Sequence, residues 1–318
     1  MHVECDMHVE CDIDGIDPQP LLFEFFEKVL RYAADRVSLD LETVGRVIVV
    51  SSDRFGRAVN SIKAGATYTN TETTIAGGKT IPRFEGGSVV SDIVLQCSLF
   101  DDLATVFADG LLSTTWDIDQ QHALYLICHE FGHALDHALR NDASEMPDPR
   151  NQPFAIVETA QYYGSIVLTE LAACGNSASV MADPLFKHSV QEAGNRMAVC
   201  ARQVKHYLDH SEDYSPNTRT HVACQGAWLN MVELAKLYGT AFGHPDREKD
   251  IRALEVDLLT GSPLGDALAS FSVVYPRWDV WSLIEELIPI WRSYGELWSV
   301  RFVTHDGIDK MEKMTHRG

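Results

Sequence analysis

The chain has 318 residues, 45% of them hydrophobic, and a formal net charge of −20 at pH 7. That charge argues against nucleic acid or an anionic membrane surface as the main partner, because both need cationic patches. The sequence has no apolar run near 18 residues and no signal-peptide pattern. Its seven cysteines are an odd number without paired spacing, which predicts reduced thiols in a cytoplasmic protein.

The N-terminus repeats the hexapeptide Met-His-Val-Glu-Cys-Asp over residues 1–12. His, Cys and Asp could hold a metal, but a duplicated start is the better interpretation. We expect residues 1–20 to form a flexible tail with no role in the fold. An amphipathic helix is predicted at 21–36, with one apolar face formed by Leu22, Phe25, Phe26, Val29 and Leu30.

A short β-branched run at 46–51 is the strongest strand signal in the chain. A helix is predicted at 53–63. The Thr- and Gly-rich stretch 66–87 favours a hairpin and turns, and 89–99 favours another strand.

The next predicted helix starts at a capping box formed by Asp117 and Gln120. Its apolar residues recur at helical period and form one stripe: Leu124, Ile127, Cys128, Phe131, Leu135 and Ala138. At about 100° per residue, His129 and His133 point almost directly away from that stripe. The helix therefore buries one face and offers the opposite face to a cleft.

His129, Glu130 and His133 match the H-E-x-x-H arrangement. Histidines four apart lie about 40° from each other around a helix and roughly 6 Å along it, so both imidazoles can reach one metal ion. Glu130 then projects beside the metal, where its carboxylate can accept a proton from water. Solvated histidines on an amphipathic helix are the alternative, but they do not predict a glutamate at the second position.

A catalytic zinc site has three protein ligands and one open position, so a third ligand is needed. His137 is excluded on an unbroken helix, because it lies about 12 Å from His129 along the axis. We expect His137 to be exposed to solvent. The metzincin pattern is excluded too, because Asp136 and Leu139 stand where it requires Gly and His.

Loop signals at 141–153 precede a second long helix, predicted at 154–173 and closed by Gly175. Glu170 is the favoured third ligand, because a carboxylate in an apolar helical run is costly to bury unless it coordinates or pairs. Glu158 is its rival, and an ordinary ion-paired glutamate is the alternative for Glu170. Two histidines and one carboxylate suit zinc.

This arrangement of His129-Glu130-x-x-His133, a loop, and a helix carrying Glu170-Leu171-x-Ala173 resembles a gluzincin-type zinc metallopeptidase. It is similar to ImmA/IrrE-type peptidases and to the zincin domain of ArdC-type antirestriction proteins. The resemblance covers about 50 residues, and Cys174 stands where many gluzincins carry an aspartate. It implies a small mixed sheet with the active-site helix, and a strand at the edge of the cleft where an extended substrate can add. We expect 89–99 to be that edge strand.

The resemblance implies one zinc ion per chain, with Glu130 as general base in the hydrolysis of a protein or peptide substrate. Tyr163, two turns before Glu170 on the same helical face, is a candidate donor to the oxyanion. Further candidates are His188, His206, His210 and His221. Two rival functions are a catalytically silent zincin used as a binding or regulatory module, and a hydrolase of a small amide.

Beyond residue 182 the pattern is largely helical, ending with a helix from 280 to about 303. The expected organisation is α+β: a zincin-like metallopeptidase domain at 21–180 and a helical C-terminal subdomain at 181–318. The sequence indicates no oligomeric state.

Overall fold

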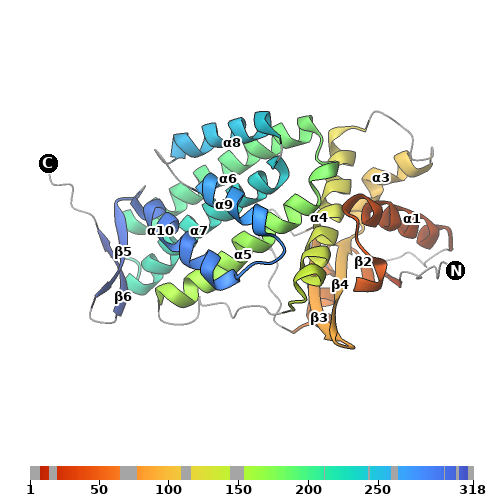
Figure 1. Ribbon diagram of the computed structural model, residues 1–318, viewed down its shortest axis with the longest axis horizontal. Coiled ribbons are helices and arrows are strands. Elements are labelled where there is room, and N and C mark those ends of the chain that lie inside the picture. The colour runs from red at the N-terminus through yellow and green to blue at the C-terminus, as the bar shows by residue number, and fades with distance from the viewer. Residues whose placement is uncertain are drawn as a thin grey trace. The chain divides into compact units, whose positions relative to one another are not determined.

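The computed structural model describes residues 8–13, 20–64, 77–108, 116–143, 154–210, 212–242, 244–258, 264–296, 298–305 and 308–313. The chain forms two compact units: unit 1 is Met1–Ser144 with Asn176–Leu185, and unit 2 is Glu145–Gly175 with Phe186–Gly318. Helices dominate and strands are few, so the fold is of the mixed α+β class, as predicted (Figure 1). None of the helices in the described ranges combines the length and apolar character needed to cross a membrane.

Unit 1 is built on a four-stranded sheet. Its elements are β1 (Val9–Asp12), α1 (Pro20–Val37), β2 (Val44–Val50), α2 (Phe55–Ile62), β3 (Gly78–Glu85), β4 (Ser88–Gln96), α3 (Ser98–Ala108) and α4 (Ile118–Arg140). The strand order is β1-β2-β4-β3, with β1, β2 and β4 parallel and β3 antiparallel to β4. Gly86 and Gly87, with φ of 61° and 91°, make the β3–β4 turn, a conformation that favours glycine.

Both faces of this sheet are covered. Alternate residues of β2 and β4, Val47, Val49, Ile93 and Leu95, pack in one core with buried side chains of α1, α3 and α4. The residues between them face the other side of the sheet, where they pack against Phe55 and Val59 of α2. These sheet residues are Ile48, Val50 and Val94, together with Ile81 of β3. Because both faces are buried, β2 is an unbroken apolar run from residue 47 to 50 instead of an alternating one.

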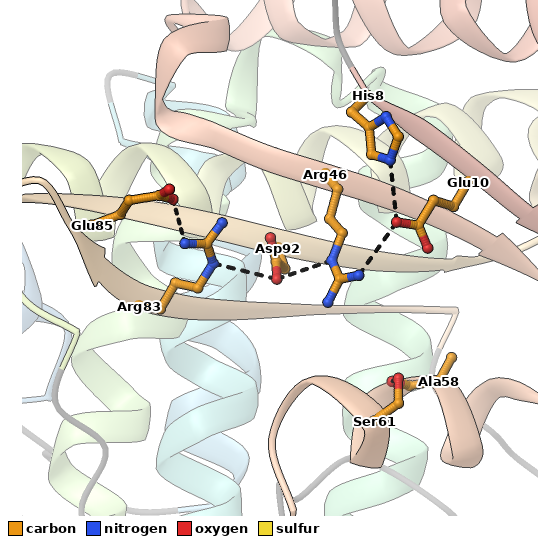
Figure 2. A network of polar contacts seen from close by, with 8 residues as sticks. All are labelled: His8, Glu10, Arg46, Ala58, Ser61, Arg83, Glu85 and Asp92. Atoms are coloured by element: carbon orange, nitrogen blue, oxygen red, sulfur yellow. Dashed lines mark hydrogen bonds and ion pairs between the residues drawn. The ribbon is translucent and has the colours of Figure 1, made fainter.

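One buried carboxylate interrupts this apolar sheet. Asp92 on β4 is 2% exposed, and Figure 2 shows it between Arg46 of β2 and Arg83 of β3. Its Oδ2 accepts a hydrogen bond from Arg46 Nε at 3.2 Å and lies 3.5 Å from Arg83 Nε. Arg46 Nη1 also lies 3.3 Å from Glu10 Oε1 on β1. The network thus links all four strands and supplies the cations that a buried carboxylate requires.

The expectation that residues 1–20 play no role in the fold is wrong for 9–12. These residues, in the second copy of the hexapeptide, form β1 and pair in parallel with β2 from Val9↔Val47 to Asp12↔Val50. Val9 and Cys11 pack against the α1–α4 core. A strand forms there because β2 is apolar on both faces and otherwise presents an unpaired edge.

The expected edge strand is also wrong. β4, predicted at 89–99, lies between β2 and β3, whereas the antiparallel edge strand is β3, in the stretch expected to form a hairpin and turns. The β3–β4 pair is indeed a hairpin, from Gly78↔Leu95 to Glu85↔Ser88. The part of the Thr-rich stretch at 65–76 lies outside the described residues.

Unit 2 is mainly helical. Its elements are α5 (Ile156–Asn176), α6 (Asp183–Asp209), α7 (Pro216–Ala241), α8 (Pro245–Leu258), α9 (Leu264–Val274), α10 (Val280–Glu296), β5 (Val300–His305) and β6 (Ile308–Lys313). Helix α7 is the most buried, and Trp228 on it stacks on Trp291 of α10, which stacks on Phe302 of β5. Gly239 and Gly226 let α7 approach α5 and α6 closely.

The observed division differs from the predicted boundary at 180. Almost all of α5, expected with the metallopeptidase domain, groups with unit 2, and Gly175 lies inside the helix instead of ending it. The last predicted helix ends at Glu296, and an antiparallel β5–β6 hairpin follows. Helix α3 had not been expected.

Candidate metal centre on helix α4

Helix α4 begins at the predicted capping box. Asp117 Oδ1 accepts a hydrogen bond from Gln120 N at 2.9 Å, and Gln120 Oε1 accepts one from Asp117 N at 3.1 Å. The predicted apolar stripe lies in the core through Leu124, Ile127, Cys128 and Phe131. His129 and His133 are partly exposed. The cap and the buried stripe together set which way the two histidines face.

The two histidine side chains converge. Nε2 of His129 lies 3.2 Å from Nε2 of His133, and the ring centroids are 4.6 Å apart at an interplanar angle of 77°. Two imidazole nitrogens bound to one tetrahedral zinc at about 2.0–2.1 Å lie about 3.3 Å apart, so this pair has the separation that a shared ion needs. The same distance suits a hydrogen bond from a protonated to an unprotonated nitrogen. Metal binding would replace that bond, because both nitrogens must then be unprotonated.

Glu130 lies against strand β3 and is 9% exposed. Thr80 Oγ1 is 2.8 Å from both the carbonyl oxygen and Oε2 of Glu130, and its single proton serves one acceptor at a time. Gly78 makes room for this side chain, because a Cβ at that position would lie 2.4 Å from Glu130 Cγ. Strand β3 therefore positions the carboxylate of Glu130.

Cys128, which precedes the motif, is a core residue. Burial raises the pKa of its thiol to about 12, so the thiol stays protonated at neutral pH. A protonated, buried thiol is neither a nucleophile nor a metal ligand.

The C-terminal end of α4 contains a buried ion pair. Asp136 is 0% exposed and accepts hydrogen bonds from Arg140 Nε at 2.9 Å and Nη2 at 2.6 Å.

The expected exposure of His137 is wrong, because the residue is 9% exposed and its Nδ1 lies 3.0 Å from the carbonyl oxygen of Asp142. Asn141, in the left-handed conformation, ends the helix just before Asp142. Burial lowers the pKa of His137.

Helix α5 carries both carboxylates predicted as third-ligand candidates. Glu158, in its first turn, is exposed, whereas the Glu170 side chain is 18% exposed and lies 3.7 Å from Lys236 Nζ. The charge of Glu170 raises the pKa of Lys236. Cys174 follows Glu170 by four residues, so both side chains project from the same face of α5. Glu170 thus takes part in an ion pair, as the alternative interpretation predicted.

Helix α5 in unit 2 thus presents a carboxylate and a thiol, and α4 in unit 1 presents two converging imidazoles. Imidazole, carboxylate and thiolate are all ligand types of protein zinc sites, so this donor set fits a transition metal better than calcium or magnesium.

The Tyr163 ring stacks on Trp228, with centroids 6.4 Å apart at 13°, and the residue is 5% exposed. This is the environment of a core aromatic in unit 2, and its role as oxyanion donor stays a prediction. Among the other histidines, His206 on α6 and His210, which directly follows this helix, are exposed.

Sequence reasoning missed Thr80, Gly78 and the ligand potential of Cys174. The Glu-x-x-x-Cys spacing on α5 was a readable signal, because side chains four apart share a helix face. Thr80 and Gly78 had no such signal, since their contact with Glu130 joins residues about 50 positions apart.

Comparisons with protein-family models, curated proteins and solved structures found no match. What this site can do therefore follows from the residues and geometry of this chain.

Proposed function

We propose that the chain is a zinc-dependent metallopeptidase that hydrolyses peptide bonds in a protein or peptide. The observation that carries the proposal is the convergence of His129 and His133, whose Nε2 atoms are 3.2 Å apart. Glu130 lies between these two histidines in the sequence, and Thr80 hydrogen-bonds to its carboxylate. A shared hydrogen bond between two histidines would account for the distance alone. It would not account for a buried carboxylate at the position of the general base.

In this proposal His129, His133 and Glu170 hold the ion. Zinc bound there would supply Lewis-acid chemistry, acidifying water and polarising a carbonyl group. Glu130 would accept a proton from the attacking water and return it to the leaving amine nitrogen. Thr80 would keep the Glu130 carboxylate oriented through both steps. Tyr163 is the proposed donor to the oxyanion.

Strand β3 supports a peptide over a small amide as substrate. Gln96 N donates to Gly77 O at 2.9 Å, so backbone groups of odd-numbered β3 residues point toward β4 and those of Gly78, Thr80 and Pro82 point away. Within the described residues no strand pairs with β3 on the side away from β4, so an extended peptide could pair there at Gly78 and Thr80, next to Glu130. Pro82 has no N–H to donate and ends this pairing after a few residues.

Metal content of the purified full-length protein, measured by mass spectrometry, tests the metal site. We expect about one zinc ion per chain, lost in His129→Ala, His133→Ala and Glu170→Ala. Glu158→Ala, a carboxylate on the same helix, is the matched control and should keep the zinc. Zinc retained in His133→Ala, or absent from the wild type even after titration, would contradict the proposal.

Peptidase activity is tested separately, by sequencing the new termini produced in a mixed peptide library. The wild type should generate cleavages that Glu130→Gln does not, although Glu130→Gln keeps its zinc because Glu130 is not a ligand. Zinc binding without any cleavage by the wild type would refute the catalytic assignment.

The second candidate function is a metal-holding binding module. Cys174 favours it, because a fourth protein ligand closes a zinc site and leaves no position for water. Cys174→Ser distinguishes the two candidates. The peptidase should keep its zinc in this variant, whereas a closed structural site should bind zinc much more weakly.

A further inference from the structure

Unit 2 contains a cavity of about 330 Å³ where the end of α6, the start of α7 and the β5–β6 hairpin meet. This volume is at the lower end of the range for small-molecule sites, roughly 300–1,000 Å³. Its wall includes four apolar side chains: Leu208, Trp298, Val300 and Met311. Gly226 on α7 lets the indole of Trp298 pack closely, because a Cβ there would lie 3.3 Å from Trp298 Cη2. A flat aromatic surface is thus fixed at the cavity wall.

The charged side chains in the lining of this cavity are Lys205, Asp209 and Arg219, so together they carry one net positive charge. Lys205 Nζ and Asp209 Oδ2 are 2.8 Å apart on α6, so their charges offset each other. Arg219, on the first turns of α7, has a buried Nε that donates to no acceptor within the described parts of the chain. Pro216, also in the lining, marks the N-terminus of α7, where the helix dipole adds further positive potential.

Because Arg219 is part of the cavity lining, the carboxylate of a ligand in the cavity would offset its positive charge. Arginine presents paired donors that match the two oxygens of a carboxylate. The apolar wall with Trp298 matches an apolar or aromatic body of the same ligand. The cavity is therefore complementary to a molecule with one anionic end and one apolar end.

We propose that this cavity binds a small organic carboxylate with an aromatic or branched apolar body. The carboxylate pairs with Arg219, and the body packs against Trp298 and Met311. This site lies wholly in unit 2 and does not depend on the proposed peptidase activity.

Isothermal titration calorimetry of the full-length protein with 4-phenylbutyrate tests the proposal, with the neutral 4-phenylbutyramide as matched probe. The acid should bind about tenfold or more tightly than the amide, the effect of a charge-assisted hydrogen bond. Arg219→Gln should remove this preference. Arg202→Gln, an exposed arginine on α6 outside the cavity lining, should leave it unchanged.

Equal affinity of the wild type for acid and amide would overturn the carboxylate assignment without relying on any variant. So would an acid preference that survives in Arg219→Gln or disappears equally in Arg202→Gln. Absence of binding by both probes up to about 10 mM, a free energy of under roughly 3 kcal/mol, would overturn the site itself.

Discussion

Replacing Gly78 with alanine tests how β3 positions Glu130. The new Cβ would lie 2.4 Å from Glu130 Cγ, 2.9 Å from Glu130 Cδ and 3.0 Å from Leu95 Cδ2. Carbon atoms in good contact are about 3.5–4.0 Å apart, so Glu130 or β3 must move by roughly 1 Å. Overpacking of this kind lowers the free energy of unfolding by about 1–3 kcal/mol. Gly78 is not at positive φ, so backbone strain adds nothing to that cost.

Urea unfolding followed by far-UV circular dichroism measures this change. Gly77→Ala is the matched control, because its Cβ would lie 3.3 Å from Leu126 Cδ1, the end of a flexible side chain, and should cost well under about 1 kcal/mol. Glu130→Ala removes the two carbons that Gly78→Ala would meet most closely. The Gly78→Ala cost should therefore shrink by about 1 kcal/mol or more in the Glu130→Ala background.

Two results would refute this reasoning. One is an equal cost for alanine at positions 77 and 78. The other is a cost at Gly78 that stays the same when Glu130 is already alanine, since that would mean the Glu130 side chain does not lie against β3.

Two further predictions concern the end of α4. Arg140→Gln removes the partner of the buried Asp136 and should lower the free energy of unfolding, measured with urea, by about 3–5 kcal/mol. The control Arg31→Gln breaks the half-exposed ion pair with Glu27 and should lower it by less than about 1 kcal/mol. Similar losses in the two variants would contradict this prediction. Burial lowers the pKa of His137 below 6.5, so the unfolded state takes up the proton first and stability falls as pH drops below 6.5. In His137→Asn the urea concentration at the unfolding midpoint should fall less between pH 7 and pH 5 than it does in the wild type. An equal fall in both proteins would exclude His137 as a source of the acid sensitivity.

Local patterns predicted the helices and strands that surround the candidate site. The capping box at Asp117, the apolar stripe of α4 and the β-branched run of β2 all concern residues within a few positions of each other. Such features are readable because backbone hydrogen bonds and side-chain periodicity within one element depend on its own residues. The convergence of His129 and His133 belongs to the same class.

Long-range pairing was harder to predict. The sequence cannot show that residues 9–12 complete a sheet, because their partner in β2 is about 38 positions away. Sequence reasoning also predicted that residues 89–99 form the edge strand of the sheet, although β4 there is paired with β2 on one side and β3 on the other. In each case the alternation of side chains fits an edge and an interior strand equally well, and only the identity of the neighbours decides.

By itself the sequence determined that one helix carries two histidines and a glutamate in the spacing of a metal site, because helix geometry follows from local hydrogen bonds. The tertiary structure decided that Glu130 lies against Thr80 and Gly78, that His137 is buried, and that Asp92 is held between two arginines. These contacts depend on close packing between elements distant in sequence. Packing of that kind is a property of the folded chain, since each side chain fits only the space that the others leave.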